Sequence, residues 1–148
     1  DVITFHSATN AVMVAAQERG KMAIAYHSDM RKVAPEAQLM AVTHEWGAYY
    51  TRRVTDVQKG QWRSGNVWAG LKEGMIRVSD FGPKLPPKVR DEIVKLQQDI
   101  AQGKRHPFQG PIADNEGKAI VAVGQKLSDV QILNMNYVVA GVMGKINP

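Results

Sequence analysis

Residues 22–46 read MAIAYHSDMRKVAPEAQLMAVTHEW, and this stretch decides the fold. It contains two short apolar runs, Met22 to Tyr26 and Leu39 to Thr43, joined by a more polar connection. Strands that are buried on both faces of a parallel sheet read as continuous apolar runs of this kind. A histidine follows each run directly, His27 after the first and His44 after the second. The stretch therefore predicts two parallel strands with polar groups at their carboxyl ends.

Outward from this stretch, strand and helix patterns alternate through the first half of the chain. Gly20 closes the first helical pattern, and Gly60 closes the second. Such alternation is typical of an α/β fold, a parallel sheet flanked by helices. The predicted elements are, in order, strand 2–5, helix 11–19, strand 22–26, strand 39–43, helix 46–59, strand 66–69 and strand 75–78.

The second of these helices is amphipathic. Its apolar residues recur at positions i, i+4, i+8 and i+11, which places them on one helical face. Trp46 is the first of them, and the pattern leaves open whether Trp46 is a core residue or a ligand contact. The stripe consists of Trp46, Tyr50, Val54 and Val57.

The second half of the chain has a different organisation. Residues 81–87 are rich in proline and glycine and indicate a connector. Pro87 suits the first position of a helix, which Gly103 closes. Residues 114–117 indicate a hairpin, and Ser128 with Asp129 indicates a capped short helix through Leu133. We expect an α/β unit over residues 1–80 and a helix and hairpin over residues 81–148 packed on the same body.

Composition excludes several classes of protein. With 148 residues, 44% of them hydrophobic and 22% charged, the chain is one ordinary globular domain in size. It contains no cysteine, which excludes a disulfide scaffold, a thiol nucleophile and a cysteine-ligated metal. The net charge of +5 is scattered rather than clustered, so we expect no nucleic-acid partner. The chain starts at Asp1 and enters an apolar run at once, which indicates a processed or cut end.

Polar residues follow three consecutive predicted strands. In an open parallel sheet, ligands bind beyond the carboxyl ends of the strands, so these residues converge on one edge if the strands are in register. The three groups are His6, Ser7 and Thr9; His27, Ser28 and Asp29; and His44, Glu45 and Trp46.

Three kinds of site fit this convergence. The first is a zinc site in a metal-dependent hydrolase, with His6, His27 and His44 as ligands beside Asp29 or Glu45, but no HExxH spacing supports it. The second is a hydrolytic site with Ser7 or Ser28 as nucleophile, but neither serine lies in a G-x-S-x-G elbow. The third is a non-catalytic binding cleft without a cofactor, which we favour.

In the binding-cleft interpretation, imidazoles, hydroxyls and one carboxylate hydrogen-bond a polar heterocycle while Trp46 or Tyr26 stacks on its face. Asp29 would accept hydrogen bonds from amino or imino groups of the ligand, or it caps a turn. The candidate ligand-binding residues are Ser7, Thr9, His27, Asp29, His44 and Trp46.

Four segments stand in the same order as in a known family. The chain resembles the basic membrane protein family, the substrate-binding proteins or lipoproteins of ABC transporters, which include bacterial purine-nucleoside receptors. The resemblance covers nearly the whole chain. The segments are YHSDM at 26–30, THEWGAYY at 43–50, GLKEGM at 70–75 and HPFQGPI at 106–112.

The resemblance implies a type I periplasmic-binding-protein fold, with two Rossmann-like lobes around a hinge and the ligand between them. Residues 1–80 would be the carboxyl-terminal lobe and residues 81–148 the returning segment, because full-length members are about twice this length. The implied partners are a purine-like ligand, an ABC permease and the missing amino-terminal lobe. The implied location is extracytoplasmic, with a lipid anchor as one option for the full-length protein. We also expect apolar surface left uncovered by the missing lobe to promote self-association.

The resemblance also bears on the ligand. Nucleoside-binding relatives carry an acidic residue and a lysine that hold the ribose, and the matching positions here are His27 and His44. Many relatives carry an aspartate after the first strand, where this chain has His6-Ser7-Ala8. A free purine base or another small heterocycle is therefore as plausible a ligand as a nucleoside.

Overall fold

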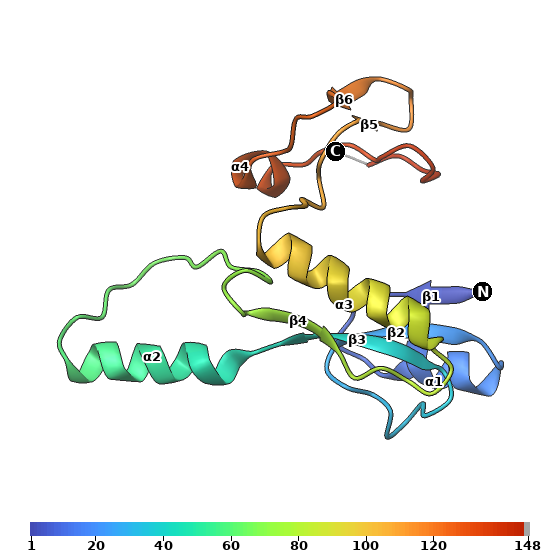
Figure 1. The fold of residues 1–148 in the computed structure, drawn as a ribbon, viewed down its shortest axis with the longest axis horizontal. Coiled ribbons are helices and arrows are strands. Elements are labelled where there is room, and N and C mark those ends of the chain that lie inside the picture. Colours follow the sequence, from blue (N-terminus) through green and yellow to red (C-terminus); the bar gives the residue numbers. More distant parts are fainter. Residues whose placement is uncertain (147–148) are drawn as a thin grey trace. The chain divides into compact units, whose positions relative to one another are not determined.

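The first 102 residues form a four-stranded mixed sheet with helices beside it. The structure is a computed structural model that describes residues 1–146. The strands lie in chain order, and Figure 1 shows them as β1 (Val2–Thr4), β2 (Met22–His27), β3 (Gln38–His44) and β4 (Ile76–Ser79). The first three strands are parallel, which confirms the predicted α/β class. β4 runs antiparallel to β3, so the sheet is mixed, with its parallel part formed by β1, β2 and β3.

Three helices accompany the sheet: α1 (Ala11–Glu18), α2 (Trp46–Gln58) and α3 (Pro87–Ala101). Each begins and ends within a few residues of its predicted bounds. Pro87 occupies the first turn of α3, where its missing N–H costs no hydrogen bond. Gln97 ties α3 to the sheet, because its Oε1 accepts a hydrogen bond from the backbone N–H of Val78 at 2.6 Å. Within residues 1–146, none of the helices combines the length and the apolar character that crossing a membrane requires.

The core of this part is built mainly from alanines. Small side chains allow α1 and the connection before β3 to approach β2 closely, and Phe5 and Met30 pack against the cluster from outside. Gln17 of α1 fastens the same connection, since its Oε1 accepts backbone hydrogen bonds from Glu36 and Ala37. The buried cluster consists of Met13, Ala16, Ala23, Ala25, Ala34, Ala37 and Ala41.

Two features around α2 differ from the sequence prediction. Residues 66–69 form no strand, because this extended segment pairs with no neighbouring strand. The helix itself extends away from the end of β3 (Figure 1), and none of its residues is buried. Its apolar stripe therefore faces solvent instead of packing on the sheet.

A close approach fixes the segment after β4. The backbone N–H of Gly82 donates a hydrogen bond to the carbonyl of Leu39 at 2.9 Å. A Cβ atom at position 82 would collide with the carbonyl oxygen of Gln38. Only glycine fits here, since it alone has no Cβ.

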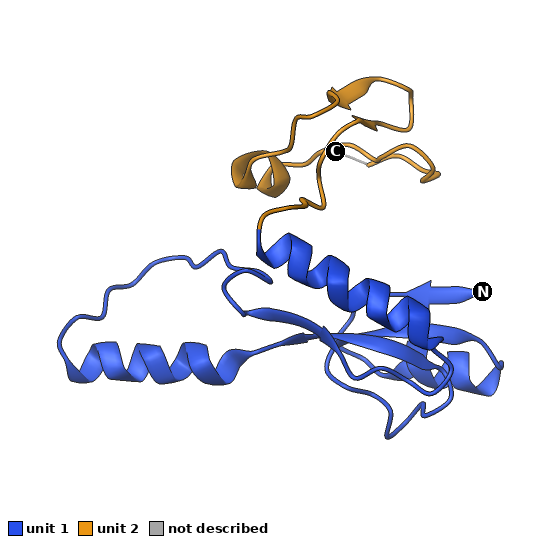
Figure 2. Cartoon of the chain, in the orientation of Figure 1, with its two compact units in different colours: residues 1–102 blue, residues 103–148 orange. Residues whose placement is uncertain are grey.

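Residues 103–148 form a second compact unit (Figure 2). It contains the short antiparallel pair β5 (Ile112–Ala113) and β6 (Ala119–Val121), which confirms the predicted hairpin. It also contains α4 (Asp129–Leu133), where Ser128 and Gln131 form the reciprocal hydrogen bonds of a capping box. The chain divides into compact units after Gln102, whereas the boundary predicted from the sequence lies after residue 80. The assignment of these parts to lobes of a two-lobe protein stays a prediction.

Candidate functional site

The carboxyl ends of β1, β2 and β3 bring three histidines together, as the sequence predicts. His27 is the last residue of β2 and stands in register with Thr43, the neighbour of His44 on β3. The rings of His27 and His44 stack with their centroids 4.9 Å apart. His6, which follows β1, lies 6.1 Å from His27 between ring centroids.

These histidines belong to a longer series of rings. Tyr26 fills the space beside His6 and His27, with centroid distances of 4.5 and 3.8 Å. Trp46 lies almost parallel to His44, at 5.5 Å and an angle of 9°. Tyr50 stacks on Trp46 at 5.7 Å, and Tyr49 meets both at steeper angles. We call this set the ring series; it consists of His6, Tyr26, His27, His44, Trp46, Tyr49 and Tyr50.

His27 and His44 are joined by a hydrogen bond as well as by stacking. Their Nδ1 atoms lie 3.3 Å apart, so one nitrogen carries a hydrogen and the other offers its lone pair. Desolvation lowers the pKa of His27, and the neighbouring His44 and His6 lower it further. His27 therefore stays neutral at a pH where an isolated imidazole is already partly protonated.

The backbone at His27 is unusual. Its φ angle is +71°, in the left-handed region that few residues other than glycine adopt. This conformation turns the chain sharply out of β2 at the point where the ring of His27 meets those of His44 and Tyr26. Histidine is among the residues that tolerate it best.

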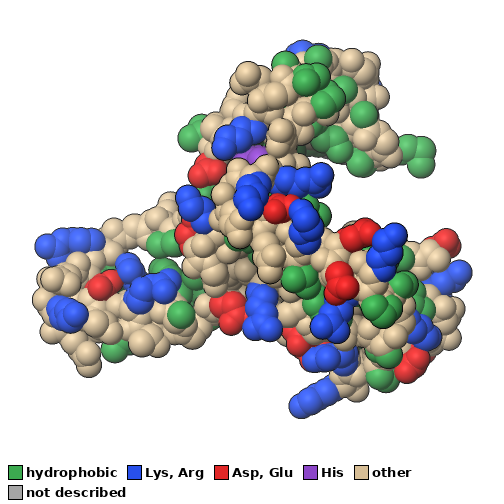
Figure 3. Space-filling model, in the orientation of Figure 1, with side chains coloured by type: hydrophobic (Ala, Val, Ile, Leu, Met, Phe, Trp, Pro, Cys, Tyr) green, Lys and Arg blue, Asp and Glu red, His purple; other side chains and the backbone are tan. Residues whose placement is uncertain are grey.

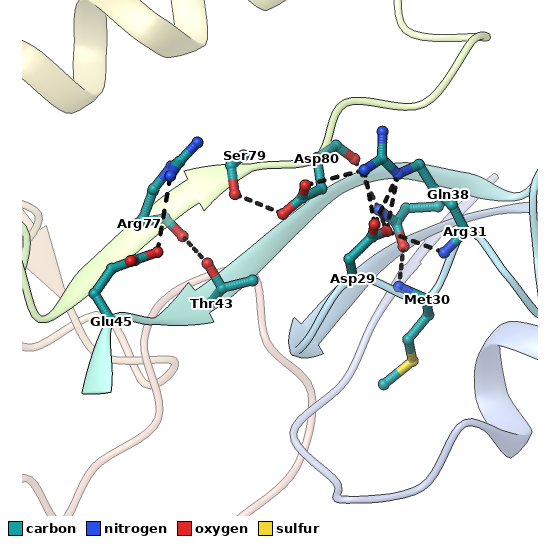
Figure 4. A network of polar contacts seen from close by, with 9 residues as sticks. All are labelled: Asp29, Met30, Arg31, Gln38, Thr43, Glu45, Arg77, Ser79 and Asp80. Atoms are coloured by element: carbon teal, nitrogen blue, oxygen red, sulfur yellow. Dashed lines mark hydrogen bonds and ion pairs between the residues drawn. The ribbon is translucent and has the colours of Figure 1, made fainter. Parts of the chain in front are cut away.

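Asp29 does not join the ring series. Its carboxylate accepts a bidentate pair of hydrogen bonds from the Arg31 side chain, Nε to Oδ1 and Nη2 to Oδ2, and another from the Arg31 backbone N–H (Figure 4). Gln38, the first residue of β3, donates to the same carboxylate at 3.0 Å, and Arg31 also pairs with Asp80. Asp29 is thus tied toward the amino end of β3, whereas His44 lies at the carboxyl end.

These contacts lower the pKa of Asp29 to about 2, chiefly through the Arg31 side chain. The turn-capping alternative describes this geometry, since Oδ1 accepts from the backbone two residues later. Its predicted contact with a ligand stays a prediction.

The remaining predicted residues lie near the same edge or just beyond it. Ser7 and Thr9 occupy the exposed connection between β1 and α1, and the Thr9 hydroxyl accepts a hydrogen bond from Ala11 N–H at the start of α1. Trp46 is 46% exposed, which decides against a core position.

Sequence reasoning missed the segment that leads into β4. Because β4 is antiparallel, its amino end lies beside His44, which pairs with Ile76. Residues 70–75 therefore reach the edge that the histidines occupy. The backbone N–H of Glu45 donates to the carbonyl of Met75 at 2.9 Å, and Glu45 faces Arg77 at 3.9 Å (Figure 4). A pocket of about 270 Å³ opens there, lined in part by Glu45, Leu71, Ile76, Arg77 and Gln97.

The geometry gives no support to a metal-dependent hydrolase. His27 and His44 are stacked, whereas the ring of His6 is tilted by 51° against that of His27. Among residues 1–146, no three histidine, aspartate or glutamate side chains gather in a way that would hold a metal ion.

Comparison with known proteins identifies the family. The family model described as "Bmp: ABC transporter substrate-binding protein PnrA-like" matches residues 1–116. The chain belongs to the Bmp family. The match includes every strand and helix of the sheet-containing part and every member of the ring series.

Two curated relatives are consistent with this membership. A purine-binding protein of Brucella abortus is 39% identical over 146 residues, which cover 99% of this chain and 41% of that protein. A putative ABC transporter glucose-binding protein of Haloferax volcanii is 22% identical over 116 residues, covering 78% of this chain and 30% of that protein. The Bmp chain thus spans less than half the length of these relatives.

One solved structure shares the fold. The crystal structure of a transcriptional activator of the comK gene from Bacillus halodurans superposes with a TM-score of 0.64 at 22% identity. The similarity covers 72% of this chain and 38% of that chain, and it supports the α/β architecture alone.

Proposed function

We propose that this chain forms one wall of the ligand site in a non-enzymatic solute-binding component of an ABC importer. The observation that carries the proposal is the ring series at the carboxyl edge of three consecutive parallel strands. Such an edge is where open α/β sheets bind ligands. Membership of the Bmp family supports the same role.

The proposed ligand is a purine base or a nucleoside-like molecule. A flat heterocycle stacks well on exposed imidazole and indole faces, and the nitrogen atoms of His6, His27 and His44 offer hydrogen bonds in the plane of its edge. The name of the Brucella abortus relative points to the same ligand class. Ser7 and Thr9 are the hydroxyl contacts of the proposal, and Asp29 is a positioning residue that holds the connection between β2 and β3.

The site is one wall rather than a closed pocket. His6 and His27 are exposed, and the chain spans only 41% of its purine-binding relative. The opposite wall is proposed to come from the amino-terminal lobe, which this chain does not include. Closure of two lobes around a solute would present a surface to an ABC permease outside the cytoplasmic membrane. A lipid anchor on the full-length protein would keep it at that location.

The test uses a chimaera in which this chain replaces the aligned segment of the Brucella abortus protein. Titration calorimetry with adenine, guanine and their nucleosides should show binding, with the bases bound at least as tightly as the nucleosides. His44→Ala should weaken binding about two- to twelvefold, the loss of one neutral hydrogen bond. His106→Ala is the matched control, because His106 is the one histidine outside the ring series. A chimaera that binds no purine, or equal effects of the two variants, would contradict the proposed site.

A further inference from the structure

The helix α2 and the segment that follows it expose an unusual number of large apolar side chains. On α2 they form one stripe, and beyond the helix two tryptophans and a valine continue it in sequence. Between 46% and 61% of each side chain is accessible to solvent. We call this set the α2 surface; it consists of Trp46, Tyr50, Val54, Val57, Trp62, Val67 and Trp68.

No other element of residues 1–102 covers this stripe. The helix leaves the sheet at the end of β3 and carries no buried residue (Figure 1). Residues 61–69, which follow the turn at the end of the helix, belong to no helix or strand. Exposed apolar side chains that share one helical face, as those of α2 do, mark a site of association rather than ordinary surface.

The charges around the α2 surface indicate what kind of partner fits. Residues 46–69 contain four basic residues and one acidic residue, a net charge of +3. The single acid, Asp56, is already paired with Arg53 at 2.9 Å. At the left end of Figure 3, where α2 lies, lysine and arginine side chains are more prominent than acidic ones. A second copy docked on the same face would bring the basic groups together, whereas an acidic rim would complement them.

We propose that the α2 surface docks an apolar, acid-rimmed face in the part of full-length Bmp proteins that this chain does not span. This proposal rests on the proposed function, because the proposed function assigns the opposite wall of the ligand site to that same missing part. Trp46 belongs to both the ring series and the α2 surface. Docking on this surface would therefore place the partner against one end of the ligand edge.

Hydrogen exchange measured by mass spectrometry tests the proposal, with the isolated chain compared with the Brucella abortus chimaera. In the isolated chain, the backbone amides of α2 should exchange rapidly, since only local hydrogen bonds protect an uncovered helix. In the chimaera they should exchange at least about tenfold more slowly. Equal exchange in the two proteins would overturn the proposal.

A pair of neighbouring substitutions provides a matched control. Val54→Glu places a charge within the apolar stripe, whereas Thr51→Glu places the same charge on an exposed position off the stripe. In the chimaera, Val54→Glu should remove the protection of α2, and Thr51→Glu should leave it in place. Loss of protection in both variants would mean that general charge effects, not a docked face, control this helix. If a chimaera fails to fold, the remaining part of the Brucella abortus protein is added to the isolated chain as a separate polypeptide, with the same readout.

Two further measurements separate the alternatives. All three tryptophans of the chain lie in the α2 surface, so acrylamide quenching of tryptophan fluorescence reports its coverage directly. If quenching of the isolated chain falls as its concentration rises, and light scattering shows a dimer, the occupant is a second copy and the proposal is wrong. If the chimaera protects α2 but binds no purine, the docking surface stands and the proposed function fails. If it binds purine while α2 stays unprotected, the docking proposal fails alone.

Discussion

At the scale of single residues, His27 is the most constrained position of the candidate site. It combines a left-handed backbone, a hydrogen bond to His44 and ring contacts with Tyr26 and His6. Desolvation and the charges that His44 and His6 carry when protonated lower the pKa of His27 and so favour its neutral imidazole.

We therefore expect His27 to titrate below 6.5, the ordinary value for histidine. NMR measurement of its ring protons against pH gives the midpoint. His44→Ala should raise this midpoint, because it removes the charge repulsion between His44 and His27. The midpoint should stay below the ordinary value, because desolvation of His27 is the larger cause of its lowered pKa. Midpoints of His27 that are identical in the wild type and in His44→Ala would show that the two rings do not interact.

Asp29 leads to a prediction of pH-dependent stability. Its pKa is about 2 in the folded chain, against about 3.9 in an unfolded chain. A carboxylate with a depressed pKa stabilises the fold at pH values above 4, and that contribution is lost as the pH falls from about 4 to 2. Its side chain is 37% exposed, so solvent screening reduces the effect to about 1 kcal/mol.

Asp29→Asn should accordingly lower the free energy of unfolding by about 1 kcal/mol at pH 7, and the difference from the wild type should shrink below pH 4. Urea unfolding at a series of pH values measures both quantities. Asp91→Asn, which replaces an exposed carboxylate on α3, is the matched control for the loss of one acidic group. A constant difference at every pH would mean that the Asp29 charge is not involved.

At the scale of elements, the segment after β4 depends on one glycine. Gly82→Ala would force a Cβ into the carbonyl of Gln38, so we expect it to destabilise the fold by about 2 kcal/mol or more. Gly47→Ala on α2 is the opposite case, because a Cβ there meets nothing within 4 Å and alanine favours a helix by about 0.5–1 kcal/mol. Thermal unfolding should move down for the first variant and not for the second. A Gly82→Ala protein as stable as the wild type would show that the backbone of β3 and of the segment after β4 shifts at little cost to make room for the methyl group.

The same elements show how far the sequence alone predicts this structure. The runs ending at Tyr26 and Thr43 identified β2 and β3, because continuous apolar runs are typical of strands within a parallel sheet. The run at 66–69 has the same local pattern and yet forms no strand, since pairing depends on a neighbour that sequence periodicity does not reveal. The reversed direction of β4 was likewise invisible, because apolar alternation carries no information on strand direction.

For the candidate site, the structure shows where the predicted residues lie, and their roles as ligand contacts stay predictions. Counting one residue past each apolar run placed His6, His27 and His44 at one edge, which the structure confirms. Asp29 was also expected at this edge, but its carboxylate accepts hydrogen bonds from Arg31 and from Gln38, and the contact with Gln38 follows from no short sequence spacing. The only available signal was the Ser-Asp turn pattern, which allowed either outcome.

At the scale of the whole molecule, the packed alanine cluster is confined to residues 13–41. We therefore expect residues 1–102 to keep a cooperative thermal transition and an α/β circular dichroism spectrum without the second unit. Removal of residues 1–21 should abolish the transition, since it deletes Met13 and Ala16 from the cluster. Non-cooperative melting of residues 1–102 would show that the second unit is required for the first to fold.

The order of the strands in the sheet has a consequence for how the chain acquires its structure. Within the four-stranded sheet, every strand pairs with the one next to it in sequence, and the pairings of this sheet fall between residues 2 and 79. Pairings between sequence neighbours keep contact order low, and low contact order is associated with fast folding. A growing polypeptide would thus have all four strands outside the ribosome, ready to pair, while much of the second unit was still being synthesised. The sheet edge that carries the histidines would form early, before the remainder of the chain competes for its apolar surfaces.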